Sequence, residues 1–574
     1  DIGENKYKEG GQASYDLNKK IVEPGTYTVR GLVHDPLKLT YDFTAYPNIG
    51  KENVPWPTHL HDGEGGWLAD HGMVLAAAFI PANESPYGKD VVALASAVSE
   101  AGPAMAYVDM NGEKLGGIWR LGGDWTGADH FARDLGERKN SSVFLYSIKA
   151  WLPSKKAPEN SVLIKILAFT KKGNLEVDYY NLLLPEGKKW NEADLGGFAV
   201  HNNLLVFSEL TSQKLYVYNT STVGVGQKGE LVRMVPFQDA RALAFSPDGS
   251  LLILQDKMIK RFSISDDYSL TEEAALVNDL DDPRQLMVTS DGRIFVADWG
   301  ASNQAKIYSP EGNLLKRIGT AGPVEAGPYD KTHMNQPHGM AIDSQNRLWV
   351  TERFRLPKRV SVWDLESSKL VRAYYGPTQY GGGGVLDPKD DNRMFYANAF
   401  GCLSFRLDRQ KGEGIPERIV YLREDFAASG GKQRYLTGKH PLYHKGKRYI
   451  TNSYSGPSTG SQAVEFWLDA EDTARPATFV GGLRGFKYFM KDQTRLKNYL
   501  PIFGEEVPED SRKARKLQIE QWKTMDTTLV CWVDHSKDGA IQPTEIQFVN
   551  LKEREDMGRI LTANIGKDFE VLLV

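Results

Sequence analysis

Oxygen-bearing side chains recur at every second position in "DHSKDGAIQPTE", residues 534–545. A calcium ion takes about six to eight oxygen ligands, so a loop that binds it must wrap around it, with a glycine at the sharp turn and a glutamate closing the loop. Gly539 stands at the turn position. The candidate ligands are Asp534, Ser536, Asp538, the Ala540 carbonyl, Gln542 and Glu545. The spacing predicts a calcium site, and the alternative is a solvated hairpin turn.

The segments beside this loop indicate what calcium would do. "TTLVCWV" (527–533) alternates as a strand, and "IQFVNL" (546–551) reads as a strand or a short turn. The loop is EF-hand-like, but these flanks do not predict the helix-loop-helix lever of a calcium sensor. Its three carboxylates imply weak affinity. We therefore expect structural calcium that stabilises the fold.

A second metal site is conceivable in "HLHDGEGGWLADHG", residues 59–72. His59 and His61 would lie on one side of a strand, with Asp62, Asp70 or His71 completing the ligand set. An H-x-H pair is a weak signal. The alternative is a group of surface histidines in a glycine-rich linker.

Three polar stretches predict a ligand site on loops. "GPYDKTHMNQPHGM" (327–340) is a long polar insertion before an apolar strand, and "TERFRLPKR" (351–359) and "YYGPTQYGGGG" (374–384) add arginines and tyrosines. A guanidinium pairs with a carboxylate through two hydrogen bonds, and a phenol can transfer a proton, so the combination suits an acidic sugar. The chemistry-bearing residues are Tyr329, Asp330, His333, Asn335, His338, Arg353, Arg355, Tyr374, Tyr375 and Tyr380.

Catalysis at these loops would use His333 or His338 as a general base, assisted by Arg353 and Tyr380. The alternative is structural: His338 bonds backbone to close a repeat, and Arg353 pairs with a neighbouring glutamate. The sequence holds no HExxH or P-loop motif, and no GxGxxG between a strand and a helix. Zinc-protease, kinase and Rossmann functions therefore lack support.

Composition favours many short strands to position these residues. The 574 residues include 55 Gly, 28 Pro and 61 aromatic side chains (12 Trp, 26 Tyr and 23 Phe), a mixture typical of turn-rich β proteins. The net charge of −4 gives no basic face for nucleic acid, and no apolar run is long enough to span a membrane. Cys402 and Cys531 allow one disulfide or two separate thiols.

Self-similarity is the strongest global signal. Residues 282–319 and 336–376 share one layout of turn, apolar strand, Asp/Ser-rich turn and further strands, and 239–264 is a shorter version. Each unit is a small four-stranded sheet that cannot bury both faces alone. Radial stacking solves this, so we expect an all-β propeller of six to eight four-stranded blades, with a β-sandwich array as the alternative.

The segments "QPHGMAID", "NRLWVTE" and "RVSVWD" resemble NHL repeats, clearly over about two units and less clearly over about four more. The resemblance implies a propeller over 85–500. It also leaves open a central metal on His201 or His338, because related propellers include metal-dependent lyases and lactone hydrolases.

The chain ends indicate further parts. Residues 1–50 resemble the end of a FlgD-type Ig-like module, 51–84 form a linker, and 501–574 hold a helix over 508–525 and the calcium loop, which together could complete the propeller. The whole chain resembles large secreted propeller proteins of planctomycete-type bacteria. The start at Asp1 suggests a processed or cut N-terminus, and further domains are expected beyond the ends.

Two functions follow. The favoured one is a secreted, cell-surface or periplasmic scaffold, stabilised by calcium, that binds a glycan or protein on its axial face and involves no nucleic acid. The alternative is a lyase or hydrolase acting on an acidic polysaccharide with His, Tyr and Arg chemistry.

Overall fold

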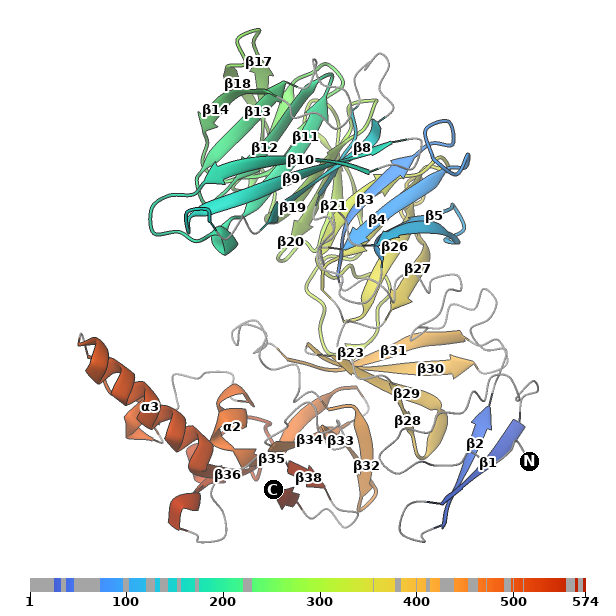
Figure 1. The fold of residues 1–574 in the computed structure, drawn as a ribbon. Helices are drawn as coiled ribbons and strands as arrows, with labels where there is room; N and C mark the ends of the chain where they lie inside the picture. The colour runs from blue at the N-terminus through green and yellow to red at the C-terminus, as the bar shows by residue number, and fades with distance from the viewer. Residues whose placement is uncertain are drawn as a thin grey trace.

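The fold is taken from a computed structural model (Figure 1). The structure describes residues 25–32, 38–45, 73–96, 103–119, 130–134, 143–151, 156–170, 175–219, 230–354, 356–376, 384–398, 400–408, 413–423, 438–452, 463–470, 472–489, 497–498, 500–508, 510–553, 563–565 and 571–573.

Six four-stranded antiparallel sheets form the first part of the molecule. The first three are β3 (Val74–Ile80), β4 (Val91–Ser96), β5 (Pro103–Val108) and β6 (Lys114–Trp119); β7 (His130–Ala132), β8 (Val143–Trp151), β9 (Ser161–Thr170) and β10 (Leu175–Leu183); and β11 (Leu195–His201), β12 (Leu204–Glu209), β13 (Lys214–Asn219) and β14 (Glu230–Pro236). The other three are β15 (Ala240–Phe245), β16 (Leu251–Gln255), β17 (Met258–Ile264) and β18 (Leu270–Val277); β19 (Asp282–Val288), β20 (Ile294–Trp299), β21 (Gln304–Tyr308) and β22 (Leu314–Ile318); and β24 (Pro337–Ile342), β25 (Arg347–Glu352), β26 (Lys358–Asp364) and β27 (Leu370–Gly376).

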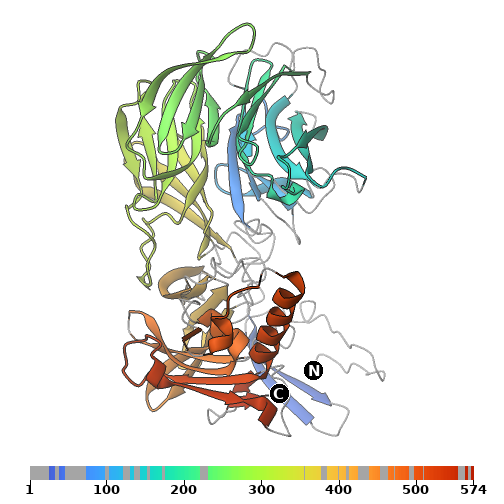
Figure 2. The ribbon, with the colours of Figure 1, turned by 90° about the vertical axis from the view of Figure 1, so that its left-hand side faces the viewer.

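The first strands of these sheets contact one another in the cyclic order β3, β7, β11, β15, β19, β24 and back to β3. The protein is therefore an all-β propeller with six blades, numbered here one to six in chain order, as the repeats predicted (Figures 1 and 2). The ring spans residues 74–376, a shorter stretch than the predicted 85–500. It closes without a strand shared between the first and last blades.

A buried carboxylate recurs at the end of the second strand in three blades. Glu209 accepts the Asp194 N–H at 2.9 Å, Asp298 accepts the Asp282 N–H at 2.8 Å, and Glu352 accepts the Asn335 N–H at 2.9 Å. Each carboxylate thus satisfies the backbone of the turn that leads into its own inner strand. These acids belong to the blade fold, because unpaired buried N–H groups are costly.

Ring closure depends on hydroxyl and imidazole contacts between the sixth and first blades. Thr351 Oγ1 accepts the Gly339 N–H at 2.8 Å and donates to the Leu75 carbonyl at 3.1 Å. His338 Nδ1 lies 3.0 Å from the same carbonyl. A Cβ on Gly339 would lie 2.2 Å from the Leu75 oxygen, so only glycine permits this approach.

A second unit follows the propeller (Figure 1). Its five-stranded sheet holds β28 (Gly384–Asp387), β29 (Asp390–Asn398), β30 (Gly401–Asp408), β31 (Glu413–Leu422) and β23 (Gly327–Pro328). Its six-stranded sheet holds β32 (His440–His444), β33 (Lys447–Thr451), β34 (Ala463–Asp469), β35 (Ala474–Gly482), β36 (Thr528–Val533) and β37 (Ile546–Asn550). The remaining strands and α-helices of the described residues are the hairpins β1 (Gly25–Leu32) with β2 (Lys38–Ala45) and β38 (Ala563–Ile565) with β39 (Val571–Leu573), and the helices α2 (Leu483–Phe489) and α3 (Ser511–Thr527).

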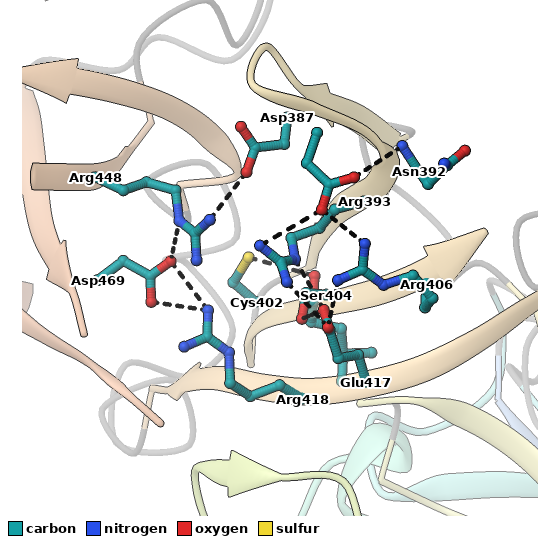
Figure 3. Close-up of polar contacts among 12 residues, drawn as sticks. Asp387, Asn392, Arg393, Cys402, Ser404, Arg406, Glu417, Arg418, Arg448 and Asp469 are labelled. Atoms are coloured by element: carbon teal, nitrogen blue, oxygen red, sulfur yellow. Dashed lines mark hydrogen bonds and ion pairs between the residues drawn. The ribbon is translucent and has the colours of Figure 1, made fainter. Parts of the chain in front are cut away.

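The two larger sheets share one hydrophobic core, which includes Phe395, Tyr421, Phe486 and Trp532. Buried charges also join them (Figure 3). Arg448 pairs with Asp387 of the five-stranded sheet at 2.9 Å and with Asp469 of its own sheet at 2.6 Å. Apolar burial and paired charges therefore act together at this junction.

One segment of the propeller reaches the second unit. The strap, defined here as residues 319–336 between β22 and β24, contributes β23, which pairs with Arg418 and Ile419 of β31. Arg359, almost fully buried in the sixth blade, holds the strap by donating to the Tyr329 hydroxyl at 2.7 Å and the His333 carbonyl at 3.1 Å.

Several expectations concern the parts outside the ring. Helix α3 confirms the predicted C-terminal helix, and Asp510 caps it by accepting the Lys513 N–H at 2.8 Å. Cys402 and Cys531 are both free thiols. The hairpin β1–β2 lies in the segment predicted to be Ig-like, and that assignment stays a prediction. In the described part of the chain, no helix is long and apolar enough to cross a membrane.

Candidate ligand site at the mouth of the channel

The first strand of each blade is its inner strand, next to the channel. The six inner strands run in the same direction, because contacts between neighbouring blades join the beginning of one inner strand to the beginning of the next, and the end of one to the end of the next. We call the end where these strands begin the mouth of the central channel. His130 from blade two and Gln285 from blade five meet there, with His130 Nδ1 2.7 Å from Gln285 Nε2. These blades stand opposite each other in the ring, so the two side chains form a crossbar over the channel.

Trp299 lies at the mouth, close to two guanidinium groups. The centre of its ring is 4.6 Å from the Arg284 guanidinium carbon and 5.5 Å from that of Arg353. Its indole N–H donates to the Pro337 carbonyl at 2.5 Å, which fixes the plane of the ring. The ring is also 6.4 Å from that of His338, which is 6.3 Å from that of His130. The arrangement is an aromatic platform with cations on it.

Of the two arginines at the mouth, Arg284 has a carboxylate partner, whereas among the described residues Arg353 has only a long contact to an amide oxygen. Arg284 pairs with Asp282 at 2.6 Å, and Asp282 also lies 3.8 Å from Arg241. Arg353 is exposed, and its polar contact to Gln336 Oε1 is long at 3.5 Å. Partial burial and then repulsion from Arg284 lower the pKa of Arg353. An anion bound between these two arginines would relieve that repulsion.

The structure places two of the four predicted catalytic residues, His338 and Arg353, near Trp299. His338 bonds the Leu75 backbone, as the structural alternative expected. Arg353 does not pair with the adjacent glutamate, because Glu352 points inward and binds Arg359 at 2.7 Å.

His333 lies away from the mouth, on the strap. Its Nε2 is 3.2 Å from the Ala321 carbonyl, and it lines a separate hollow of about 430 Å³ together with Tyr329, Asp330 and Asn335. The four residues between His333 and His338 carry the chain from the strap into β24. His333 and His338 therefore do not form one catalytic pair.

The other predicted residues are distributed differently. Tyr374 stacks on Trp349 with ring centres 5.7 Å apart, and Tyr375 faces Tyr329 at 6.3 Å. His201 ends β11, at the opposite end of the channel from the start of β24, and packs on Phe245 at 5.3 Å. The residues His59, His61, Asp62, Asp70, His71, Arg355 and Tyr380 lie outside the described residues.

Sequence reasoning missed Trp299, Arg284, His130 and Gln285. A signal for Trp299 was present in the repeats. In "FVADWG" and "WVTERF" the residue after the buried carboxylate is Trp299 in one blade and Arg353 in the next, so equivalent positions of neighbouring blades meet at the mouth. His130 has no such signal, because its blade matches the repeat pattern poorly.

The predicted calcium loop is flanked by β36 and, after a short turn at Pro543–Glu545, by β37. Asp534 organises it: one oxygen accepts the Asp538 N–H at 3.1 Å and the other the Gly539 N–H at 3.1 Å. Lys537 and Gly539 have positive φ angles of 64° and 72°, which produce the sharp turn. The backbone thus wraps around the Asp534 carboxylate.

Other contacts in the loop bear on whether a cation fits. Glu545 accepts the Ser536 N–H at 2.8 Å and the Trp532 indole N–H at 3.3 Å. Arg475 forms an ion pair with Asp534 and would have to move away from a metal. Across the described ranges, no group of three or more His, Cys, Asp or Glu side chains is arranged to hold a metal ion, but this loop also offers hydroxyl, amide and carbonyl oxygens.

No family model matches the chain, and no curated protein matches it. Three solved structures similar to it are virginiamycin B lyase from Staphylococcus aureus (13% identity, 61% of this chain and 95% of that one, TM-score 0.29), the Cps50 (Swd1) β-propeller domain from Myceliophteria thermophila (11%, 51% and 98%, 0.32) and a protein from Lactobacillus plantarum (12%, 61% and 96%, 0.32). These similarities concern the propeller fold alone and give no activity to this chain.

Proposed function

We propose that the protein is a binding scaffold whose propeller recognises an acidic glycan at the mouth of its channel. The observation that carries the proposal is the Trp299 ring with the guanidinium groups of Arg284 and Arg353 close to it. An aromatic face packs against the apolar face of a sugar ring, and a guanidinium binds a carboxylate through two hydrogen bonds. A uronic acid offers both groups on one residue.

Binding is favoured over turnover by what the two histidines at the mouth already do. His130 Nδ1 contacts Gln285, and His338 Nδ1 contacts the Leu75 carbonyl. A general base needs a nitrogen within hydrogen-bond reach of the substrate proton, and these two contacts orient the rings for structural roles. A lyase or hydrolase that acts on an acidic polysaccharide is the alternative function.

The proposal is tested by calorimetric titration with a short oligogalacturonate and, as a neutral probe, its methyl ester. We expect the acid to bind more tightly than the ester, with an affinity that falls as salt rises. Arg353→Gln should weaken binding of the acid about tenfold, since a charged hydrogen bond contributes about 1.5–3 kcal/mol.

The matched control is Arg233→Gln on the outer strand of blade three, where Arg233 is exposed and pairs with Asp267 at 3.3 Å. That variant should bind like the parent protein. Equal affinity for acid and ester, or an unchanged affinity in Arg353→Gln, would contradict the proposal. Release of new sugar ends during the titration would support the enzymatic alternative.

The proposal includes calcium and an extracellular location. The oxygens that Asp534, Ser536, Asp538, Ala540, Gln542 and Glu545 present suit calcium, and the turn that wraps Asp534 supports this assignment. A weak site of this kind fills where calcium is abundant, outside the cell. Because its flanks are strands, calcium would stabilise the second unit without contributing to the mouth.

A further inference from the structure

The channel below the crossbar widens into a chamber of about 490 Å³. The inner strands of all six blades line it, so it lies on the axis of the ring. Its volume falls within the range of about 300–1,000 Å³ in which proteins bind small molecules. The crossbar residues His130 and Gln285 belong to the same lining, at the end next to the mouth.

Apolar side chains form much of the wall of the chamber. Several apolar side chains of the inner strands line the chamber and are partly exposed, although they also pack against hydrophobic clusters between blades. The residues that line the chamber and meet this description are Ala77, Phe79, Phe131, Ala244, Met287 and Ile342. They come from five of the six blades, which makes an apolar ring around the axis.

Small side chains keep the chamber open. Seven alanines line it, and they leave space on the axis that larger residues would fill. Exposed apolar surface around a hollow of this size is unfavourable in water, so an apolar occupant would stabilise the ring.

Two arginines, each paired with a carboxylate, lie at the end of the chamber opposite the mouth. Arg133 follows β7 directly and lines the chamber. Its Nη1 donates to the Phe79 carbonyl at 2.7 Å, and its Nη2 pairs with Glu84. Its Nε is buried and has no hydrogen-bond partner. Arg293, paired with Asp291 at 2.8 Å, lies at the same end.

We infer that the chamber binds a small amphipathic acid, with its apolar body between the inner strands and its acidic group at Arg133. This site is distinct from the glycan site proposed at the mouth, because the crossbar separates the two. The ligand enters from the Arg133 end. Recognition combines apolar burial with a charge-assisted hydrogen bond to the Arg133 guanidinium, which lines the chamber.

The test uses two fluorescent probes with the same aromatic body: 1-anilinonaphthalene-8-sulfonate, which carries an anionic group, and N-phenyl-1-naphthylamine, which does not. We expect both to gain fluorescence with one binding site, and the sulfonate to bind more tightly. Displacement of the sulfonate by decanoate but not by decanol would show that an acidic chain competes. Displacement by an aromatic acid such as 1-naphthoate alone would identify an aromatic ligand.

Two kinds of variant distinguish binding of the ligand's apolar part from binding of its acidic group. The double substitution Ala77→Leu and Ala244→Leu fills the chamber and should abolish binding of both probes. The substitution Arg133→Gln should weaken the sulfonate about tenfold and leave the neutral amine unchanged, and Arg133→Lys should restore part of the difference. Ala274→Leu, on an exposed outer strand, is the matched control for added volume.

Other outcomes would overturn the inference. Unchanged binding in the filled variant, with its melting temperature preserved, would place the probes elsewhere. A loss of sulfonate binding in Arg353→Gln would place them at the mouth. If the filled variant does not fold, Met287→Trp supplies a second way to fill the chamber. Failure of these probes leaves the oligogalacturonate titration unaffected, so the two proposals can fail separately.

Discussion

Gln285 and His130 are 155 residues apart in the chain and lie on opposite blades, yet their side chains meet at 2.7 Å over the channel. The contact joins two blades that share no edge. It therefore ties the ring across its centre, in addition to the contacts that run around it.

The crossbar should contribute to stability. In Gln285→Met the contact is lost while the side-chain volume is kept, and we expect the free energy of unfolding to fall by about 1 kcal/mol, the net value of a typical hydrogen bond. Urea unfolding followed by tryptophan fluorescence measures this. Gln345→Met, at an exposed turn, should unfold like the parent protein. An equal loss of unfolding free energy in both variants would show that the crossbar does not stabilise the ring.

Ring closure should depend on the Thr351 hydroxyl. Thr351→Val keeps the shape but leaves the buried Gly339 N–H without its acceptor, so we expect a loss of about 1–3 kcal/mol. Ser208 makes the corresponding contacts between blades three and four, accepting from Gly197 at 2.7 Å and donating to Ala240 at 2.6 Å. Ser208→Ala should therefore cost a similar amount. A neutral Thr351→Val would show that His338 alone closes the ring.

The charges on the five-stranded sheet predict an acid-dependent loss of stability (Figure 3). Burial by itself would raise the pKa of Glu417, but its hydrogen bonds to Arg393 at 2.9 Å and Arg406 at 2.9 Å outweigh burial and lower the pKa to about 2. Because folding lowers the pKa of Glu417, its ionised carboxylate stabilises the folded protein fully above about pH 4.5, the ordinary pKa of the group. This stabilisation is lost as the pH falls toward 2.

Glu417→Gln should remove this dependence. We expect the parent protein to lose about 1 kcal/mol of unfolding free energy between pH 5 and pH 2 through this group, a modest figure because the carboxylate is partly exposed. The variant should be less stable at neutral pH and show a shallower slope in acid. Identical slopes in thermal unfolding from pH 2 to pH 6 would contradict the assignment.

Calcium should be detectable through Trp532. Its indole N–H contacts Glu545, the predicted closing ligand, so calcium that draws Glu545 inward should change the tryptophan fluorescence. Adding EGTA to the loaded protein should lower the melting temperature and leave glycan binding unchanged. Asp538→Asn is expected to weaken calcium binding, while Arg475→Gln should strengthen it by removing the cation that competes for Asp534. A melting curve that EGTA does not shift would contradict structural calcium.

Periodicity in the sequence predicted the propeller because each blade repeats the same alternation of apolar strands and polar turns. Repeats 282–319 and 336–376 are the fifth and sixth blades, and the helix near residue 510 was visible from its cap and its apolar positions. Local patterns of this kind depend on residues that are close together in the sequence, so a single sequence reveals them. The spacing of the calcium loop and its strand flanks belong to the same class of local information.

Only the tertiary structure decided which residues share a site. His333 and His338 are five positions apart, yet one lies on the strap and the other at the mouth. Trp299 joins Arg353 because neighbouring blades place equivalent positions side by side, and His130 meets Gln285 because six blades bring opposite strands within side-chain reach. These contacts depend on how many blades close the ring. The sequence determined the repeating unit, whereas the closure of the ring determined the channel, its crossbar and the chamber below it.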